Sequence, residues 1–157
     1  MTATQSSTST DRIEKRVTLR APRARVWRAL TRADEFGAWF GVKLERELAE
    51  GAQVRGRITI KGYEDAMFEM FVERIQPERL FSYRWHPYAV DPKHDYSSEP
   101  TTLVEFRLDE AEGETILTIV ESGFDQLPAA RRAEAFRMNE GGWTGQIRNI
   151  ERYVTAG

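Results

Sequence analysis

The middle of the chain is a run of short segments in which apolar and polar side chains alternate. This alternation is typical of strands with one buried and one exposed face. Because no helical pattern interrupts the run, successive strands are expected to pair antiparallel. The expected strands cover residues 53–60, 67–75, 79–86, 101–108 and 114–121.

Helical patterns lie on either side of this run. A further strand is expected at residues 12–20, followed by two short helices, the first starting near Pro22 and the second covering Asp34 to Phe40. Residues 128–154 are expected to form a longer helix, because apolar residues recur there at spacings near three and four. Strands and helices are therefore segregated, which indicates an α+β fold with the long helix across the sheet.

The length of 157 residues suits one domain with its own core. Residues 1–11 are polar and rich in Ser and Thr, so we expect a disordered N-terminal tail, followed by a single domain over residues 12–157. The tail has no apolar core, so it is predicted to be neither a signal peptide nor a membrane span. The protein is predicted to be cytoplasmic.

Charge and cysteine content exclude several classes of function. With 23 Lys and Arg against 25 Asp and Glu, the net charge is −2, which argues against nucleic acid as a partner. The chain has no cysteine, and therefore no disulfide, no thiolate nucleophile and no cysteine-ligated zinc or iron–sulfur cluster. It also lacks a Gly-rich dinucleotide fingerprint, so we expect no cofactor.

Four segments of the chain resemble a known family. They are VWRALTRADEFGAWFG, PERLFSYRW, ESGF and GGWTGQIRNIERYV, and in this order they resemble the family named for the activator of the heat-shock-protein-90 ATPase, within the START-like (SRPBCC) superfamily. The resemblance covers the chain from about Ile13 onward. It implies a helix-grip fold, in which a curved antiparallel sheet of about six strands wraps a long C-terminal helix, with an apolar cavity between them. It implies no single function, because the superfamily includes co-chaperone domains, lipid carriers and a few enzymes.

Aromatic residues are the main candidates for the lining of such a cavity. Phe81, Tyr83 and Trp85 occupy alternate positions of one expected strand and so share a face. A set this rich in aromatic side chains suits a planar or acyl ligand, unless the side chains fill the interior outright. The rim is expected at residues 36–40 and in the long loop 87–100. The predicted ligand-binding residues are Trp39, Phe40, Phe68, Met70, Tyr83, Trp85, Phe106, Trp143 and Ile147.

Gly141 and Gly142 lie within the expected C-terminal helix, where each glycine costs about 1 kcal/mol relative to alanine. One explanation is that the helix bends or approaches the sheet closely there, while Trp143 turns inward with Ile147 and Ile150 to roof a pocket. The alternative is a break between two helices, with Trp143 in the core.

Some polar residues could act inside the cavity. A buried carboxylate would have a raised pKa and could act as an acid or base, and Glu69 and Glu121 are the candidates. Arg84, Arg107 and Tyr83 could orient a ligand. The chain contains no Gly-x-Ser-x-Gly elbow, no His-Glu-x-x-His motif and no phosphate loop, so we predict no catalytic residue.

The long loop and its start combine residue types that can bind metals, namely His86, Asp91, His94 and Asp95. Imidazole and carboxylate groups together suit zinc or iron. Their spacing matches no metal-binding signature, so we predict no metal site and interpret the loop as solvated or as a lid.

Three functions are compatible with these observations. We favour non-catalytic binding of a small hydrophobic molecule, aromatic or acyl, between the sheet and the C-terminal helix. The second is a co-chaperone-like interaction module with a chaperone or another protein as its partner. The third is a cofactor-independent cyclase or hydrolase that uses acid or base residues such as Glu69, Glu121 or His86. The protein could be a monomer, or a homodimer that pairs sheet edges.

Overall fold

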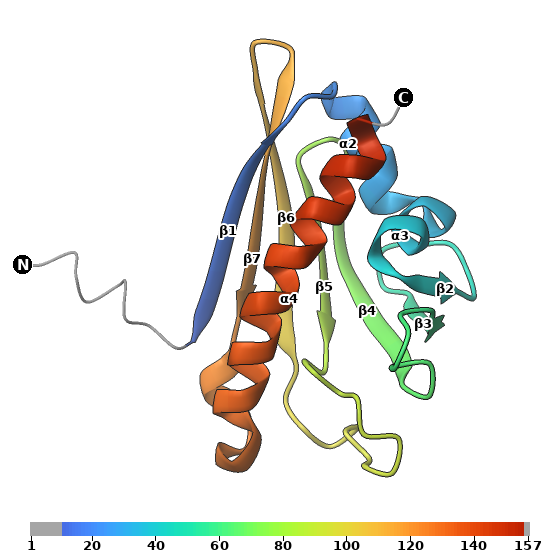
Figure 1. The fold of residues 1–157 in the computed structure, drawn as a ribbon, viewed down its shortest axis with the longest axis vertical. Coiled ribbons are helices and arrows are strands. Elements are labelled where there is room, and N and C mark those ends of the chain that lie inside the picture. The colour runs from blue at the N-terminus through green and yellow to red at the C-terminus, as the bar shows by residue number, and fades with distance from the viewer. Residues whose placement is uncertain (1–10, 156–157) are drawn as a thin grey trace, which may run out of the picture.

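The described residues form one antiparallel sheet of seven strands (Figure 1). The computed structural model describes residues 11–155, so the predicted N-terminal tail lies outside the described residues except for Asp11. The strands lie side by side in the order β1-β7-β6-β5-β4-β3-β2. Their bounds are β1 Arg12–Leu19, β2 Val42–Leu44, β3 Gln53–Ile58, β4 Met67–Gln76, β5 Leu80–Trp85, β6 Thr102–Ala111 and β7 Glu114–Ser122.

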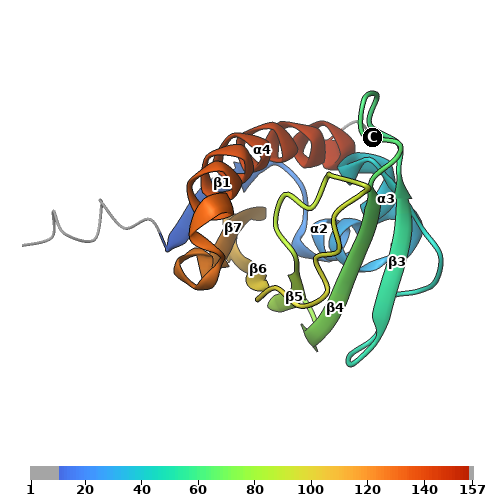
Figure 2. The same cartoon turned by 90° about the horizontal axis from the view of Figure 1, so that it is seen from below.

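The helices fall into two groups along the chain. Between β1 and β2 lie α2, Arg23–Thr31, and α3, Ala33–Phe40; after β7 come the 3-10 helix η1, Phe124–Gln126, and α4, Ala129–Thr155. Figure 2 shows that the sheet curves and that α4 lies along its open side. This is a helix-grip arrangement, so the predicted α+β class and order of elements are confirmed.

Two short elements differ from the expectation. Strand β2 pairs with β3 and makes the sheet seven strands wide instead of about six. Its three residues are too few to show an alternating pattern, which explains why the sequence does not predict it. The 3-10 helix η1 is also only three residues long.

The sheet has an irregularity between β4 and β5. Their register shifts between Val72 and Arg74, so that one extra residue of β4 is accommodated there. Such a bulge bends its strand and increases the local twist, which contributes to the curvature around α4.

Helix α3 packs closely on the edge of the sheet because Gly37 has no side chain. A Cβ at this position would lie 2.1 Å from the carbonyl oxygen of Val42. Gly41 then ends α3 with a φ of 98°, a left-handed conformation that glycine adopts without strain. This packing places Phe36, Trp39 and Phe40 in the core, where all three are buried.

Candidate ligand-binding site

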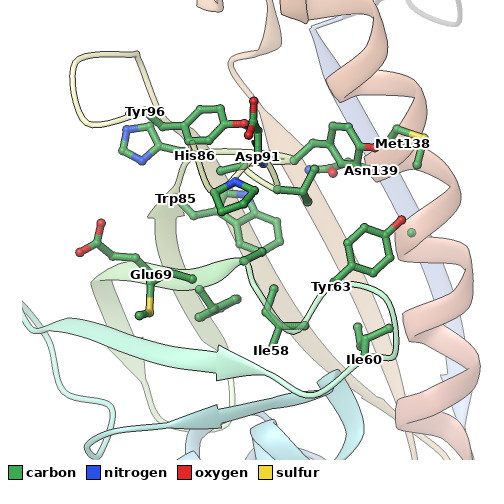
Figure 3. Close-up of a pocket in the computed structure, with 18 of the residues that line it drawn as sticks. Ile58, Ile60, Tyr63, Glu69, Trp85, His86, Asp91, Tyr96, Met138 and Asn139 are labelled. Carbon is green, nitrogen blue, oxygen red and sulfur yellow. Dashed lines mark hydrogen bonds between the residues drawn. The ribbon is translucent and has the colours of Figure 1, made fainter. Parts of the chain in front are cut away.

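A cavity of about 760 Å³ lies between α4 and the end of the sheet formed by β3, β4 and β5. Figure 3 shows Ile58 and Ile60 on one side of it and Tyr96 on the other. Most of the lining comes from three segments, which fall within residues 58–69, 85–97 and 137–146. The cavity therefore lies where the β3–β4 loop and the long β5–β6 loop meet the C-terminal helix.

Four aromatic side chains form the apolar wall of the cavity: Phe40, Phe68, Trp85 and Trp143. The ring centroid of Phe40 lies 5.4 Å from that of Phe68, 6.0 Å from that of Trp85 and 6.2 Å from that of Trp143. Trp85 and Trp143 are 5.9 Å apart. These are ordinary distances for favourable edge-to-face and tilted aromatic pairs, so the four rings support one another. We call these four residues the aromatic wall.

Gly141 and Gly142 face open space at the cavity. Both line it, and a Cβ added to either would meet nothing within 4 Å. Helix α4 runs without interruption from Ala129 to Thr155, so the expected break between two helices is wrong. The expectation that the helix approaches the sheet closely at these glycines is wrong as well, because the space beside them is empty. The missing side chains instead enlarge the cavity on the helix side.

The predicted ligand-binding residues separate into two groups. The four residues of the aromatic wall line the cavity, and Phe40 is the part of the expected rim 36–40 that does so. The others do not line it: Met70, Tyr83 and Phe106 are fully buried in the core, Trp39 donates its indole N–H to the carbonyl oxygen of Ala29, and Ile147 is half-buried on α4.

The β3–β4 side of the cavity is not predicted by the sequence patterns. Ile58, Ile60, Tyr63 and Met67 line it there, and Asn139 lines it on α4. Asn139 precedes Trp143 by four residues, which places both on one helix face, so helical spacing could have revealed it. The expected loop does contribute, through residues between Tyr88 and Ser97.

Glu121 of β7, the one carboxylate that is buried among residues 11–155, anchors the aromatic wall. It accepts hydrogen bonds of 2.7 Å from both indoles, from Trp85 Nε1 at Oε2 and from Trp143 Nε1 at Oε1. Thr102 Oγ1 donates to Oε2 over 2.6 Å, and Asn139 Nδ2 lies 3.0 and 3.1 Å from the two carboxylate oxygens. Side chains from β5, β6 and α4 therefore meet at Glu121, which fixes the position of Trp85 relative to Trp143.

Burial raises the pKa of Glu121, and the hydrogen bonds from its neighbours oppose that rise without cancelling it. Glu121 does not itself line the cavity. Glu69 does, and there it hydrogen-bonds to Gln53 and, over 2.9 Å, to Arg55. The nearby Tyr83 hydroxyl is buried and has no hydrogen-bond partner among the described residues. Burial, and secondarily the charge of Glu121, raises the pKa of Tyr83.

The other polar candidates have partners away from the cavity wall. Arg84 pairs with Glu73 over 2.8 Å and Arg107 pairs with Glu105 over 3.0 Å, in partly exposed ion pairs.

The β5–β6 loop is tied to the first turn of α4. Arg131 donates to Glu99 Oε1 over 2.9 Å and to the carbonyl oxygens of Pro87 and Tyr88 over 3.0 and 3.2 Å. The second Glu99 oxygen contacts His94 Nε2 at 2.8 Å. Burial raises the pKa of Glu99, but the hydrogen bonds from His94 and Arg131 outweigh it and lower the pKa overall.

The possible metal ligands of this loop have separate partners. His86 Nε2 lies 3.1 Å from the carbonyl oxygen of Glu99, and Asp91 and Asp95 accept hydrogen bonds from loop N–H groups. Within residues 11–155, no group of three or more His, Cys, Asp or Glu side chains could hold a metal ion.

The curved sheet, the long C-terminal helix and the order of elements define a START-like domain of the SRPBCC superfamily. A family model described as Activator of Hsp90 ATPase homolog 1-like protein matches residues 20–155. The chain therefore belongs to this family, which confirms the resemblance seen in the sequence. A comparison with curated proteins finds no match. None of the helices in the described part of the chain is long and apolar enough to cross a membrane.

Solved structures with this fold share little sequence with the chain. Protein MLL2253 from Mesorhizobium loti is 21% identical with a TM-score of 0.73, over 92% of this chain and 97% of that one. Ms6760 from Mycobacterium smegmatis is 18% identical with a TM-score of 0.73, over 94% and 93%. DynU16, from the dynemicin biosynthetic locus, is 23% identical with a TM-score of 0.69; 92% of this chain is covered, but it spans only 47% of that protein. At these identities the likeness shows the fold alone.

Proposed function

We propose that this protein binds a small hydrophobic molecule in the cavity between the sheet and α4. The observation that carries the proposal is the cavity itself, about 760 Å³ in volume and walled by four aromatic side chains. Ligand pockets in proteins are concave, largely apolar and roughly 300–1,000 Å³ in volume. The aromatic wall favours a ligand with a flat ring system, because such a ring can pack against indole and phenyl faces.

Exposed apolar residues at the rim support the same function. Among residues 11–155, the exposed large hydrophobic side chains are Ile60, Tyr63 and Met67, with exposed fractions of 42%, 39% and 59%. All three line the cavity. Exposed apolar side chains that cluster mark a binding surface more often than scattered ones do. A ligand seated among them would remove part of this surface from water.

The contacts of Glu121 favour binding over acid–base catalysis. Its two oxygens already accept five hydrogen bonds from protein side chains, and the residue does not line the cavity. In this proposal Glu121 holds the aromatic wall in place. A co-chaperone-like module, the alternative that the family description raises, would use the outer surface and would not need a cavity.

A substitution that fills the cavity tests the proposal. Gly142→Leu would place a side chain in the open space at the helix surface, where Nile red, a neutral planar fluorescent dye, is expected to bind. We expect the dye to bind the wild-type protein with increased emission and to bind Gly142→Leu at least about tenfold more weakly, a difference of about 1.4 kcal/mol.

Gly145→Leu is the matched control. Gly145 lies in the same helix and its Cβ would also meet nothing within 4 Å, but it does not line the cavity. The Gly145→Leu protein should bind Nile red with the same affinity as the wild type. Thermal unfolding of all three proteins confirms that they are folded. Equal dye affinity in the wild type and Gly142→Leu would refute binding in this cavity.

A further inference from the structure

Asn139 is the polar side chain that links the cavity to the buried carboxylate. It lines the cavity from α4, and its Nδ2 donates to both oxygens of Glu121. Its carbonyl oxygen Oδ1 accepts no hydrogen bond from the described residues. Asn139 is half-buried and Oδ1 is not fully buried, so this oxygen can accept a hydrogen bond from a bound molecule.

The orientation of the Asn139 amide is set by chemistry. Indole N–H groups can only donate, so the Trp85 and Trp143 contacts require that both Glu121 oxygens act as acceptors. While Glu121 is ionised, a flipped amide would place Oδ1 against two oxygens that can only accept. Nδ2 therefore faces Glu121, and Oδ1 faces away from it as a fixed acceptor.

Charges at the rim disfavour an anionic ligand. Asp65, Asp91 and Asp95 line the cavity, are exposed, and form no ion pair with Lys or Arg among residues 11–155. Of the two arginines that line it, Arg55 is paired with Glu69, which leaves Arg137. Three carboxylates without an ion pair thus share the rim with one guanidinium without an ion pair, and a carboxylate ligand would meet net repulsion.

We infer that the cavity selects an uncharged aromatic ligand that donates a hydrogen bond, through an O–H or N–H group, to Asn139 Oδ1. This inference rests on the proposed function and adds the chemical class of the ligand and the residue that discriminates it. An unpaired acceptor in a pocket favours a donor, because a ligand without one leaves the acceptor desolvated and unsatisfied.

Three naphthalenes of matched shape test the inference by isothermal titration calorimetry at neutral pH. 2-Naphthol carries a donor, 2-methoxynaphthalene carries only an acceptor, and 2-naphthoate is an anion. We expect 2-naphthol to bind about fivefold more tightly than 2-methoxynaphthalene, which is the effect of one net hydrogen bond. 2-Naphthoate should bind more weakly than either.

Variants locate the effect. Asn139→Ala should reduce the preference for 2-naphthol over 2-methoxynaphthalene to nearly one, because the acceptor that distinguishes the two compounds is removed. Asn149→Ala, on the same helix but outside the cavity, should keep the full preference. If Asn139→Ala proves unfolded, the wild-type comparison of the three compounds still decides, because it needs no variant.

The outcomes separate the two claims. Equal binding of 2-naphthol and 2-methoxynaphthalene, tighter binding of 2-naphthoate, or an unchanged preference in Asn139→Ala would overturn the inference and leave the proposed function standing. Failure of all three compounds and of Nile red to bind the folded wild-type protein would overturn the proposed function and the inference together.

Discussion

A carboxylate removed from water is tolerated where hydrogen-bond donors surround it, and Glu121 meets this condition. Its donors come from segments far apart in the sequence: Trp85 on β5, Thr102 on β6, and Asn139 and Trp143 on α4. The carboxylate thereby connects three strands of the sheet to the helix. At the scale of single residues, it is the part of the structure on which the shape of the cavity most depends.

Glu121→Gln should lower the free energy of unfolding by about 1–3 kcal/mol, because glutamine has one acceptor oxygen and leaves a buried indole N–H unpaired. The folded-state pKa of Glu121 is raised above its ordinary value by burial. Its contribution to stability is therefore fully present below the unfolded-state pKa and decreases as the pH rises through the folded-state pKa. The gap between wild type and variant should narrow with rising pH, as measured by urea denaturation between about pH 4 and pH 8.

Glu73→Gln provides the matched control, since Glu73 lies on β4 and forms a partly exposed ion pair with Arg84. Such pairs contribute about 0–1 kcal/mol, so this variant should unfold nearly as the wild type does. A gap for Glu121→Gln that widens toward alkaline pH would contradict a raised pKa. If Glu121→Gln proves as stable as Glu73→Gln, Glu121 does not anchor the aromatic wall.

At the scale of elements, glycines in two helices serve opposite purposes. Gly37 allows α3 to touch the backbone of β2, whereas Gly141 and Gly142 leave space open beside α4. Intrinsic helix propensity disfavours all three positions equally. Their surroundings therefore decide what a methyl group would do at each.

Gly37→Ala should destabilise the fold by at least about 1–3 kcal/mol, the usual cost of overpacking. Its Cβ would lie 2.1 Å from the Val42 carbonyl oxygen, and backbone would have to move. Gly142→Ala should instead stabilise the protein by up to about 1 kcal/mol, because alanine is the better helix former and the site is open. Chemical denaturation measures the free energy of unfolding of both variants. A change of the same sign in both would contradict the description of the packing around α3 or around α4.

The sequence patterns predict well which face of a strand or helix is buried. They predict less well whether a residue on that face lies in the packed core or at the cavity. Phe81, Tyr83 and Trp85 share one face of β5 as expected, yet the first two are fully buried and Trp85 lines the cavity. The difference arises from position along the strand, because the cavity opens only near the end of β5. That position depends on where α3 and α4 cross the sheet, which periodicity does not encode.

The position of Glu121 was predictable from the sequence, but the positions of its hydrogen-bond donors were not. Glu121 falls in the alternating register of Leu117 and Ile119, both buried, so its place on the inner face follows from the pattern of β7. Its donors could not be predicted, because the approach of Trp85, Thr102 and Asn139 depends on the tertiary fold. The alternation of residues 53–60 likewise predicted a strand but gave no sign that Ile58 and Ile60 line the cavity.

At the scale of the whole molecule, the curved sheet and α4 enclose two kinds of interior. One part is a packed core to which α2 and α3 contribute, and the other is the cavity, which is lined by residues of the β3–β4 and β5–β6 loops. Arg131 ties the longer of these loops to α4. The aromatic wall is therefore held by hydrogen bonds to Glu121 while the apolar rim is exposed, which suits the proposed function.

The most direct measurement is native mass spectrometry of the wild-type protein and Gly142→Leu. Both are purified without detergent and incubated with a small-molecule extract of the source organism. We expect the wild type to retain one small aromatic molecule per chain, released on denaturation, and Gly142→Leu to retain none. An unbound mass for both proteins, or the same bound molecule on both, would contradict the claim that the cavity is the functional site.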